Sequence, residues 1–182
     1  MDKDYVVIAR FDDETDEKLN SLRKRLQEKG YIKTISDWSP HITIAAYEGI
    51  PLDALLQWTD DFAKKYLPFD VSFSSLGIFP PTGEHMEAAM LFASPSQSKY
   101  LMEFYYAFHE KLDEYCGNLG WLYSMKFGHP AIHSTIGIVD VVSMQKAIEM
   151  ILEHKIFEKV TINALEIYTY PMELVQRFEL EK

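Results

Sequence analysis

Two short segments of this chain carry the same pattern, a histidine and a threonine separated by one residue. The first is His41-Ile42-Thr43 and the second is His133-Ser134-Thr135. Side chains on a β-strand alternate between its two faces, so the histidine and threonine of each segment point the same way, roughly 7 Å apart along the strand. A single pattern of this kind most often holds a structural histidine, but two copies in equivalent places favour a shared chemical role.

Cleavage of a phosphodiester uses this set of groups. One neutral imidazole removes a proton from water or a hydroxyl, and a second, protonated imidazole gives a proton to the departing oxygen. Histidine suits both tasks because its unperturbed pKa, about 6.5, lies near working pH. Threonine hydroxyls can donate hydrogen bonds to the non-bridging phosphate oxygens. We therefore predict His41 and His133 as an acid–base pair, with Thr43 and Thr135 binding phosphate.

The elements expected around the two segments also repeat. Each half of the chain is predicted to run strand, helix, strand opening with His-x-Thr, helix and strand. Displaced by one constant interval, His41 and Pro51 correspond to His133 and Ser143. The pattern predicts a single α+β domain over residues 1–182, a bilobal, duplicated β-α-β-α-β arrangement. The lobes are placed at about 1–80 and 81–182, allowing for exchanged strands, with two antiparallel-rich sheets facing a central groove and helices outside.

Two local predictions affect how the second segment is held. Apolar residues at helical spacing from Leu101 to Tyr115 predict one long helix that ends at Gly117-Asn118. Residues 131–139 predict a strand that includes His133.

Composition narrows the classes of partner. The formal net charge is −10 and the sequence pI is about 5.0, which argues against a long nucleic-acid ligand, because such proteins usually carry a basic stripe. A small phosphate ligand remains compatible with this charge. No stretch approaches the roughly 20 apolar residues of a membrane span. The acidic start of the chain is unlike a signal peptide, and the lone Cys116 cannot form an internal disulfide, which agrees with a cytoplasmic location. We expect a monomer without a membrane partner.

The longer segments Ser39-Pro40-His41-Ile42-Thr43-Ile44-Ala45 and Ile132-His133-Ser134-Thr135-Ile136-Gly137 resemble the paired signatures of the 2H phosphoesterase superfamily. That group includes proteins called 2′-5′ RNA ligase-like and cyclic nucleotide phosphodiesterases. The resemblance implies a bilobal fold with a central groove and no required metal or other cofactor. It also implies action on a 2′,3′-cyclic or 2′-5′ linked phosphate of a small nucleotide or an RNA end. The second segment departs from the first because no proline directly precedes its histidine: Pro130 lies three residues before His133.

Other residues and functions compete with this interpretation. Arg10 and Tyr47, at the ends of two predicted strands, are candidates to contact the substrate, although an ion pair and core packing are the alternatives. His129, His133 and His41 could form a zinc site, but Pro130 argues against a regular strand there. A non-catalytic module that holds a nucleotide or a phosphorylated partner in the same groove is the alternative function.

Overall fold

The computed structural model describes residues 3–33, 38–81, 88–126, 130–169 and 173–181. Among them, no helix is both long enough and apolar enough to cross a membrane. The elements in chain order are β1 (Tyr5–Phe11), α1 (Asp13–Glu28), β2 (His41–Tyr47), α2 (Leu52–Ala63), β3 (Phe69–Phe79), β4 (Ala88–Pro95), α3 (Lys99–Phe108), the 3₁₀ turn η1 (Asp113–Tyr115), α4 (Gly117–Gly120), β5 (Ser134–Asp140), η2 (Val141–Ser143), α5 (Met144–Glu153), β6 (Lys159–Thr169) and β7 (Glu173–Glu179).

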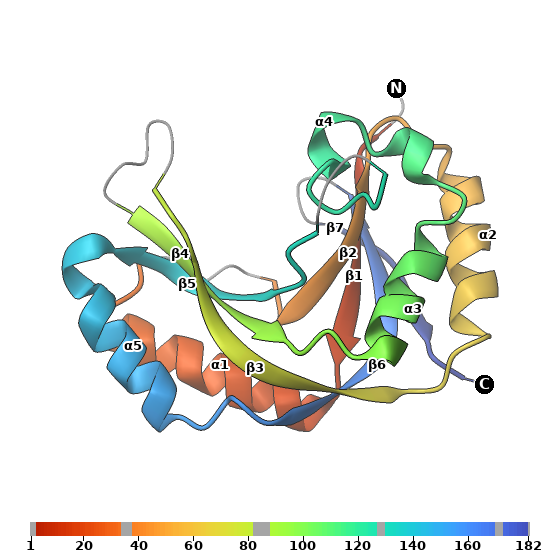
Figure 1. The fold of residues 1–182 in the computed structure, drawn as a ribbon. Helices are drawn as coiled ribbons and strands as arrows, with labels where there is room; N and C mark the ends of the chain where they lie inside the picture. The colour runs from red at the N-terminus through yellow and green to blue at the C-terminus, as the bar shows by residue number, and fades with distance from the viewer. Residues whose placement is uncertain (1–2, 34–37, 82–87, 127–129, 170–172, 182) are drawn as a thin grey trace.

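This order confirms the predicted α+β class and the two successive strand–helix–strand–helix–strand runs. The prediction of two sheets is wrong. The strands form one seven-stranded antiparallel sheet in the order β2-β1-β6-β3-β4-β5, with β7 added to β6. Figure 1 shows this sheet bent into two arms, one of β1, β2 and β6 and the other of β3, β4 and β5.

The sheet is continuous because β3 and β6 are long enough to serve both arms. The first residues of β3, Phe69 to Ser72, pair with β6, whereas Phe73 to Phe79 pair with β4. An irregular register between Phe73 and Ser75 marks the change of partner, as expected where a strand bends. The two arms therefore have equivalent strand orders: β2, β1 and β6 in one correspond to β5, β4 and β3 in the other.

Helices from different halves of the chain cover the same arm. Helix α1 is capped by Asp12, whose carboxylate accepts a hydrogen bond from the Thr15 amide, and the helix buries Leu19, Leu22 and Leu26. These leucines lie at the helical spacing expected of a core-facing stripe. In Figure 1, α1 and α5 run below the arm of β3, β4 and β5, while α2 and α3 flank the other arm.

The long helix predicted up to Tyr115 is interrupted after Phe108. The indole Nε1–H of Trp58 donates to the Phe108 carbonyl at 3.1 Å, and this bond occupies an acceptor that a continuing helix would use. The chain then turns through η1 and the short helix α4, which packs against β2.

Gly120 provides the first prediction. A Cβ atom at this position would lie 1.9 Å from the Ala46 carbonyl oxygen, which is fixed in β2. We expect Gly120→Ala to destabilise the protein by about 1–3 kcal/mol through overpacking. Thermal unfolding measures this change. Asn118→Ala, at an exposed position of the same helix, is the control and should stay within about 0.5 kcal/mol of wild type. Equal melting temperatures for the two variants would contradict the described packing of α4 on β2.

Candidate functional site

The four residues of the two His-x-Thr segments line one cavity of about 290 Å³. The cavity lies between β2 and β5, the end strands of the main strand order. Its remaining lining consists of Arg23, Trp38, Met90, Tyr123, Ile136, Gly137 and Ile138. The volume lies near the lower end of the range for small-molecule sites. His133 itself precedes β5, which begins at Ser134, so the prediction that this histidine lies within the strand is corrected by one residue.

A matched β-bulge follows each threonine. In the β1–β2 ladder, Ile8 pairs with Thr43 and Val7 pairs with Ala45, so Ile44 is the extra residue. In the β4–β5 ladder, Phe92 pairs with Thr135 and Leu91 with Gly137, so Ile136 is the extra residue. A bulge adds one residue to one strand and re-aims the side chains that follow it. The two copies are therefore alike in backbone geometry, beyond their short common sequence.

Each histidine ring is held by its own backbone. His41 Nδ1 lies 2.8 Å from the carbonyl oxygen of Ser39, and His133 Nδ1 lies 2.5 Å from that of Ala131. A carbonyl oxygen can only accept, so Nδ1 carries the proton in both rings, and a neutral ring then presents an unprotonated Nε2. Neither Nε2 has a hydrogen-bond partner among the described residues. Both nitrogens are therefore available to a ligand in the cavity.

Burial lowers the pKa of both histidines. The pKa of His41 falls to about 4, chiefly through burial and further through the charges of Arg23, Arg10 and His133, against the opposing effect of the Ser39 hydrogen bond. Burial also lowers the pKa of His133, opposed by the bond to Ala131. Two guanidinium groups thus act on His41 in addition to its desolvation. Both imidazoles are neutral at pH 7 in the ligand-free protein.

Different aromatic side chains pack against the two imidazoles. Trp38 meets His41 edge to face at a centroid distance of 5.0 Å. Phe79 and Phe92 both pack on His133, at 5.0 and 5.1 Å. The Phe92 ring lies over Gly77, its partner in the β3–β4 ladder, where a Cβ atom would approach that ring to 2.1 Å. Gly77 therefore provides the space that lets Phe92 support His133.

The two threonine hydroxyls also have different partners. Thr43 shares a side-chain hydrogen bond with Tyr123, whereas the Thr135 hydroxyl donates to the Met90 sulfur at 3.3 Å. A thioether is a weak acceptor. Thr135 can therefore exchange this weak hydrogen bond for one to a phosphate oxygen at little cost in free energy.

Behind Thr43, a buried polar cluster holds the first bulge. His109 Nε2 lies 2.9 Å from the Ile44 carbonyl oxygen, and its Nδ1 lies 2.5 Å from Asp113. Among the described residues, His109, Asp113 and Cys116 form the group whose ligand atoms lie close enough together for a metal, within 4.8 Å. The hydrogen bonds already occupy these atoms, and burial raises the pKa of Cys116 to about 12, which disfavours the thiolate that a metal would need. His129, of the predicted alternative zinc site, lies outside the described residues.

Arg10 and Tyr47, predicted as substrate contacts, do not line this cavity. Arg10 is buried, donates to the Pro40 carbonyl at 2.8 Å and pairs with the carboxylates of Asp16 and Glu166. Tyr47 is fully buried in the main core. Strict alternation would place Tyr47 on the face of Thr43, but the bulge at Ile44 shifts the alternation by one residue.

Arg23 is a cavity-lining residue that sequence analysis did not single out. It lies on the same helix face as Leu19, Leu22 and Leu26 and is only 4% exposed. A charged residue within an apolar helical stripe was the available signal, because lysine and arginine are rarely fully buried without a reason.

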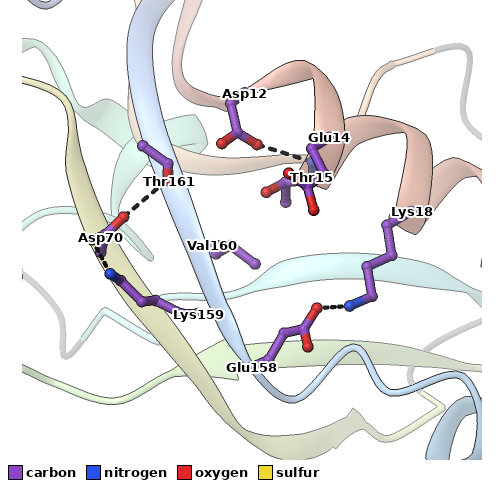
Figure 2. Close-up of a pocket in the computed structure, with 9 residues that line it drawn as sticks. All are labelled: Asp12, Glu14, Thr15, Lys18, Asp70, Glu158, Lys159, Val160 and Thr161. Carbon is purple, nitrogen blue, oxygen red and sulfur yellow. Dashed lines mark hydrogen bonds and ion pairs between the residues drawn. The ribbon is translucent and has the colours of Figure 1, made fainter.

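A second, more polar depression lies between the start of α1 and strands β3 and β6, with a volume of about 190 Å³ (Figure 2). Four of its charged side chains form ion pairs, Lys18 with Glu158 and Lys159 with Asp70, and Asp70 also accepts a hydrogen bond from Thr161. This internal pairing makes it a weaker candidate for a ligand site than the cavity between the two His-x-Thr segments.

The sequence model of the 2′-5′ RNA ligase superfamily matches residues 5–171. The chain belongs to this superfamily. The resemblance to 2H phosphoesterases is thereby confirmed. No curated protein sequence matches the chain.

Several solved structures share the fold of this chain. TT0787 of Thermus thermophilus has a TM-score of 0.62 at 13% identity, over 97% of both chains. Escherichia coli LigT in its apo form has a TM-score of 0.59 at 10% identity, over 99% of this chain and 98% of LigT. Usb1 of Kluyveromyces marxianus has a TM-score of 0.56 at 10% identity, over 98% and 99%. LigT structures have also been solved with phosphate and with 3′-AMP.

The lowered pKa values of the two histidines give a prediction for the ligand-free protein. In an NMR pH titration, the His41 ring signals should change near pH 4 and those of His133 below 6.5. The unfolded chain takes up a proton on His41 near pH 6.5, but the folded chain does so only near pH 4. Stability should therefore fall as the pH drops through this window, and His41→Gln should reduce that dependence. A His41 pKa of 6.5 or above would contradict the described environment.

Proposed function

We propose that this chain is a metal-independent phosphoesterase that hydrolyses a 2′,3′-cyclic phosphate or a 2′-5′ phosphodiester of a nucleotide or an RNA end. His41 and His133 would act as the acid–base pair, and Thr43 and Thr135 would bind the phosphate. One observation carries the proposal: two imidazoles and two threonine hydroxyls from equivalent strands line a single cavity. In-line displacement at phosphorus needs a proton acceptor on one side and a proton donor on the other.

The surroundings of the two rings suggest which histidine takes which role. The positive charges of Arg23 and Arg10 disfavour protonation of His41, and a ring that stays neutral suits the role of base. His133 is not subject to these charges and suits the acid. In the proposed step, His41 Nε2 takes a proton from water, and the water oxygen forms the new bond to phosphorus. His133, which enters this step as the imidazolium protonated on both nitrogens, gives its Nε2 proton to the ribose oxygen as that oxygen leaves.

Two further features support a nucleotide-sized substrate. The cavity of about 290 Å³ has aromatic and aliphatic walls supplied by Trp38, Tyr123 and Ile138, on which the flat face of a base could pack. LigT, which shares the fold, has been solved with 3′-AMP. A mononucleotide or the terminal nucleotide of an RNA is the substrate class we infer for this chain.

Substitution of the histidines tests the mechanism. We expect His41→Ala and His133→Ala each to lower the rate roughly 10²- to 10⁴-fold, because each removes a proton-transfer group. The double variant should lose little more than either single variant, since both groups act in one displacement. Thr43→Val or Thr135→Val should lower the rate roughly 10²-fold.

The rates should be measured with 2′,3′-cyclic nucleotides and short RNA ends as substrates, in the presence of EDTA. His154→Ala, at the end of α5 beside Arg25, is the control and should retain full activity. Activity that survives loss of both cavity histidines would overturn the mechanism. A wild-type chain that binds cyclic nucleotides without hydrolysing any of them would favour the binding module.

The pH dependence gives an independent test. For kcat/KM, the acid limb should report His41, near pH 4, and the alkaline limb His133, whose pKa burial lowers, so the maximum should lie on the acid side of neutrality. A bound phosphate anion favours both imidazolium forms. The kcat profile should therefore be displaced to higher pH than the kcat/KM profile. Identical profiles, or an alkaline limb that persists in His133→Ala, would contradict the assignment of the acid.

A further inference from the structure

Two arginines lie deep in the protein near His41, and among the described residues only one of them forms a direct ion pair. Arg10 forms ion pairs with Asp16 and Glu166. Arg23 has no carboxylate oxygen within 4 Å among the described residues, although it is 4% exposed. Asp16 acts on it only at longer range. A buried charge without a direct counter-ion is strongly unfavourable unless something compensates it. Within the part of the chain that the structure describes, the positive charge of Arg23 at the cavity wall is therefore only partly compensated.

The hydrogen bonds of Arg23 connect the two His-x-Thr segments. From α1, its Nη1 donates to the Trp38 carbonyl at 2.9 Å, three residues before His41, and its Nη2 donates to the Thr135 carbonyl at 2.5 Å. A guanidinium has five N–H groups in a planar fork, so three remain after these two bonds. The fork is thus fixed in orientation and still has donors for a ligand.

We propose that Arg23 binds the substrate phosphate and supplies the counter-charge that this anion needs between the two histidines. The inference rests on the proposed phosphoesterase function and adds a residue to it. Arg23 lines the same cavity as His41, Thr43, His133 and Thr135. Hydrogen bonds between a guanidinium and phosphate are strong because both partners are charged and the fork matches the oxygens. The same charge adds to the burial that keeps His41 neutral before the anion arrives, and the anion balances this charge afterwards.

Burial lowers the pKa of Arg23 to about 10, so the group is still cationic at neutral pH. The charge of Arg23 acts on His41 but not appreciably on His133. Loss of this charge therefore has a signature that loss of a purely structural bond would lack. In the ligand-free protein it should raise the pKa of His41 and leave that of His133 in place.

Titration of the wild-type protein with inorganic phosphate is the first test. The Nε–Hε signal of Arg23 should shift with saturation, and that of Arg25 should not. Arg25 lies two residues further along α1 and contacts His154 away from the cavity. This measurement does not depend on a variant that might fold poorly. Phosphate that saturates the histidine signals without moving the Arg23 signal would overturn the proposal.

The matched variants Arg23→Gln, Arg23→Lys and Arg25→Gln provide the second test. We expect Arg23→Gln to weaken phosphate binding and to lower kcat/KM, each roughly 10- to 100-fold, and to raise the pKa of His41. Arg23→Lys keeps the charge but loses the fork, so it should fall between Arg23→Gln and wild type. Arg25→Gln should match wild type in all three measurements.

The outcomes separate this inference from the proposed function. A folded Arg23→Gln variant that binds phosphate and hydrolyses substrate as wild type does would overturn the role of Arg23 and leave the phosphoesterase function intact. Conversely, Arg23→Gln could lose phosphate binding while wild type hydrolyses none of the tested substrates. That result would support Arg23 as an anion-binding residue and overturn the proposed hydrolysis.

Discussion

The arrangement of the cavity depends on one repeated interaction, the hydrogen bond from each histidine Nδ1 to the carbonyl oxygen two residues earlier. This bond sets the tautomer of each ring, and the aromatic rings packed on the imidazoles help to hold their rotation. The bulges, the aromatic rings of Trp38, Phe79 and Phe92, and the bonds of Arg23 then determine where the two ring-bearing segments lie. Because the orienting acceptors are neutral carbonyls rather than carboxylates, nothing in these bonds favours the charged imidazole strongly, and burial dominates the pKa of both rings.

The two copies are equivalent in backbone geometry but not in electrostatics. The same bulge, the same histidine bond and the same strand order occur twice. Around His41 the protein places two guanidinium groups and a tryptophan, whereas around His133 it places two phenylalanines. An acid–base pair needs this kind of difference, since two identical sites would titrate alike. The repeated geometry supplies matched positions, and the different surroundings distinguish the two rings.

The sequence was sufficient for the features that depend on local pattern. The His-x-Thr spacing, the apolar periodicity and the equal interval between the copies predicted the order of elements and the four cavity residues. It was insufficient where one extra residue or one distant partner decides the outcome. The bulge at Ile44 places Tyr47 in the core, and the length of β3 and β6 joins two expected sheets into one. Arg23 meets Thr135 across 112 positions of sequence, a contact that no spacing rule reveals.

The central place of β6 in the sheet also has a consequence for folding. Strand β1 pairs with β2 on one edge and with β6 on the other, and β6 spans Lys159–Thr169, near the end of the described chain. During synthesis, the first His-x-Thr strand is therefore available early, while the neighbouring edge of β1 stays open until residues 159–169 have been made. Pairing over such a long separation closes a large loop and slows folding relative to local contacts. Until β6 arrives, the nascent protein exposes a hydrophobic strand edge of the kind that aggregates or recruits chaperones.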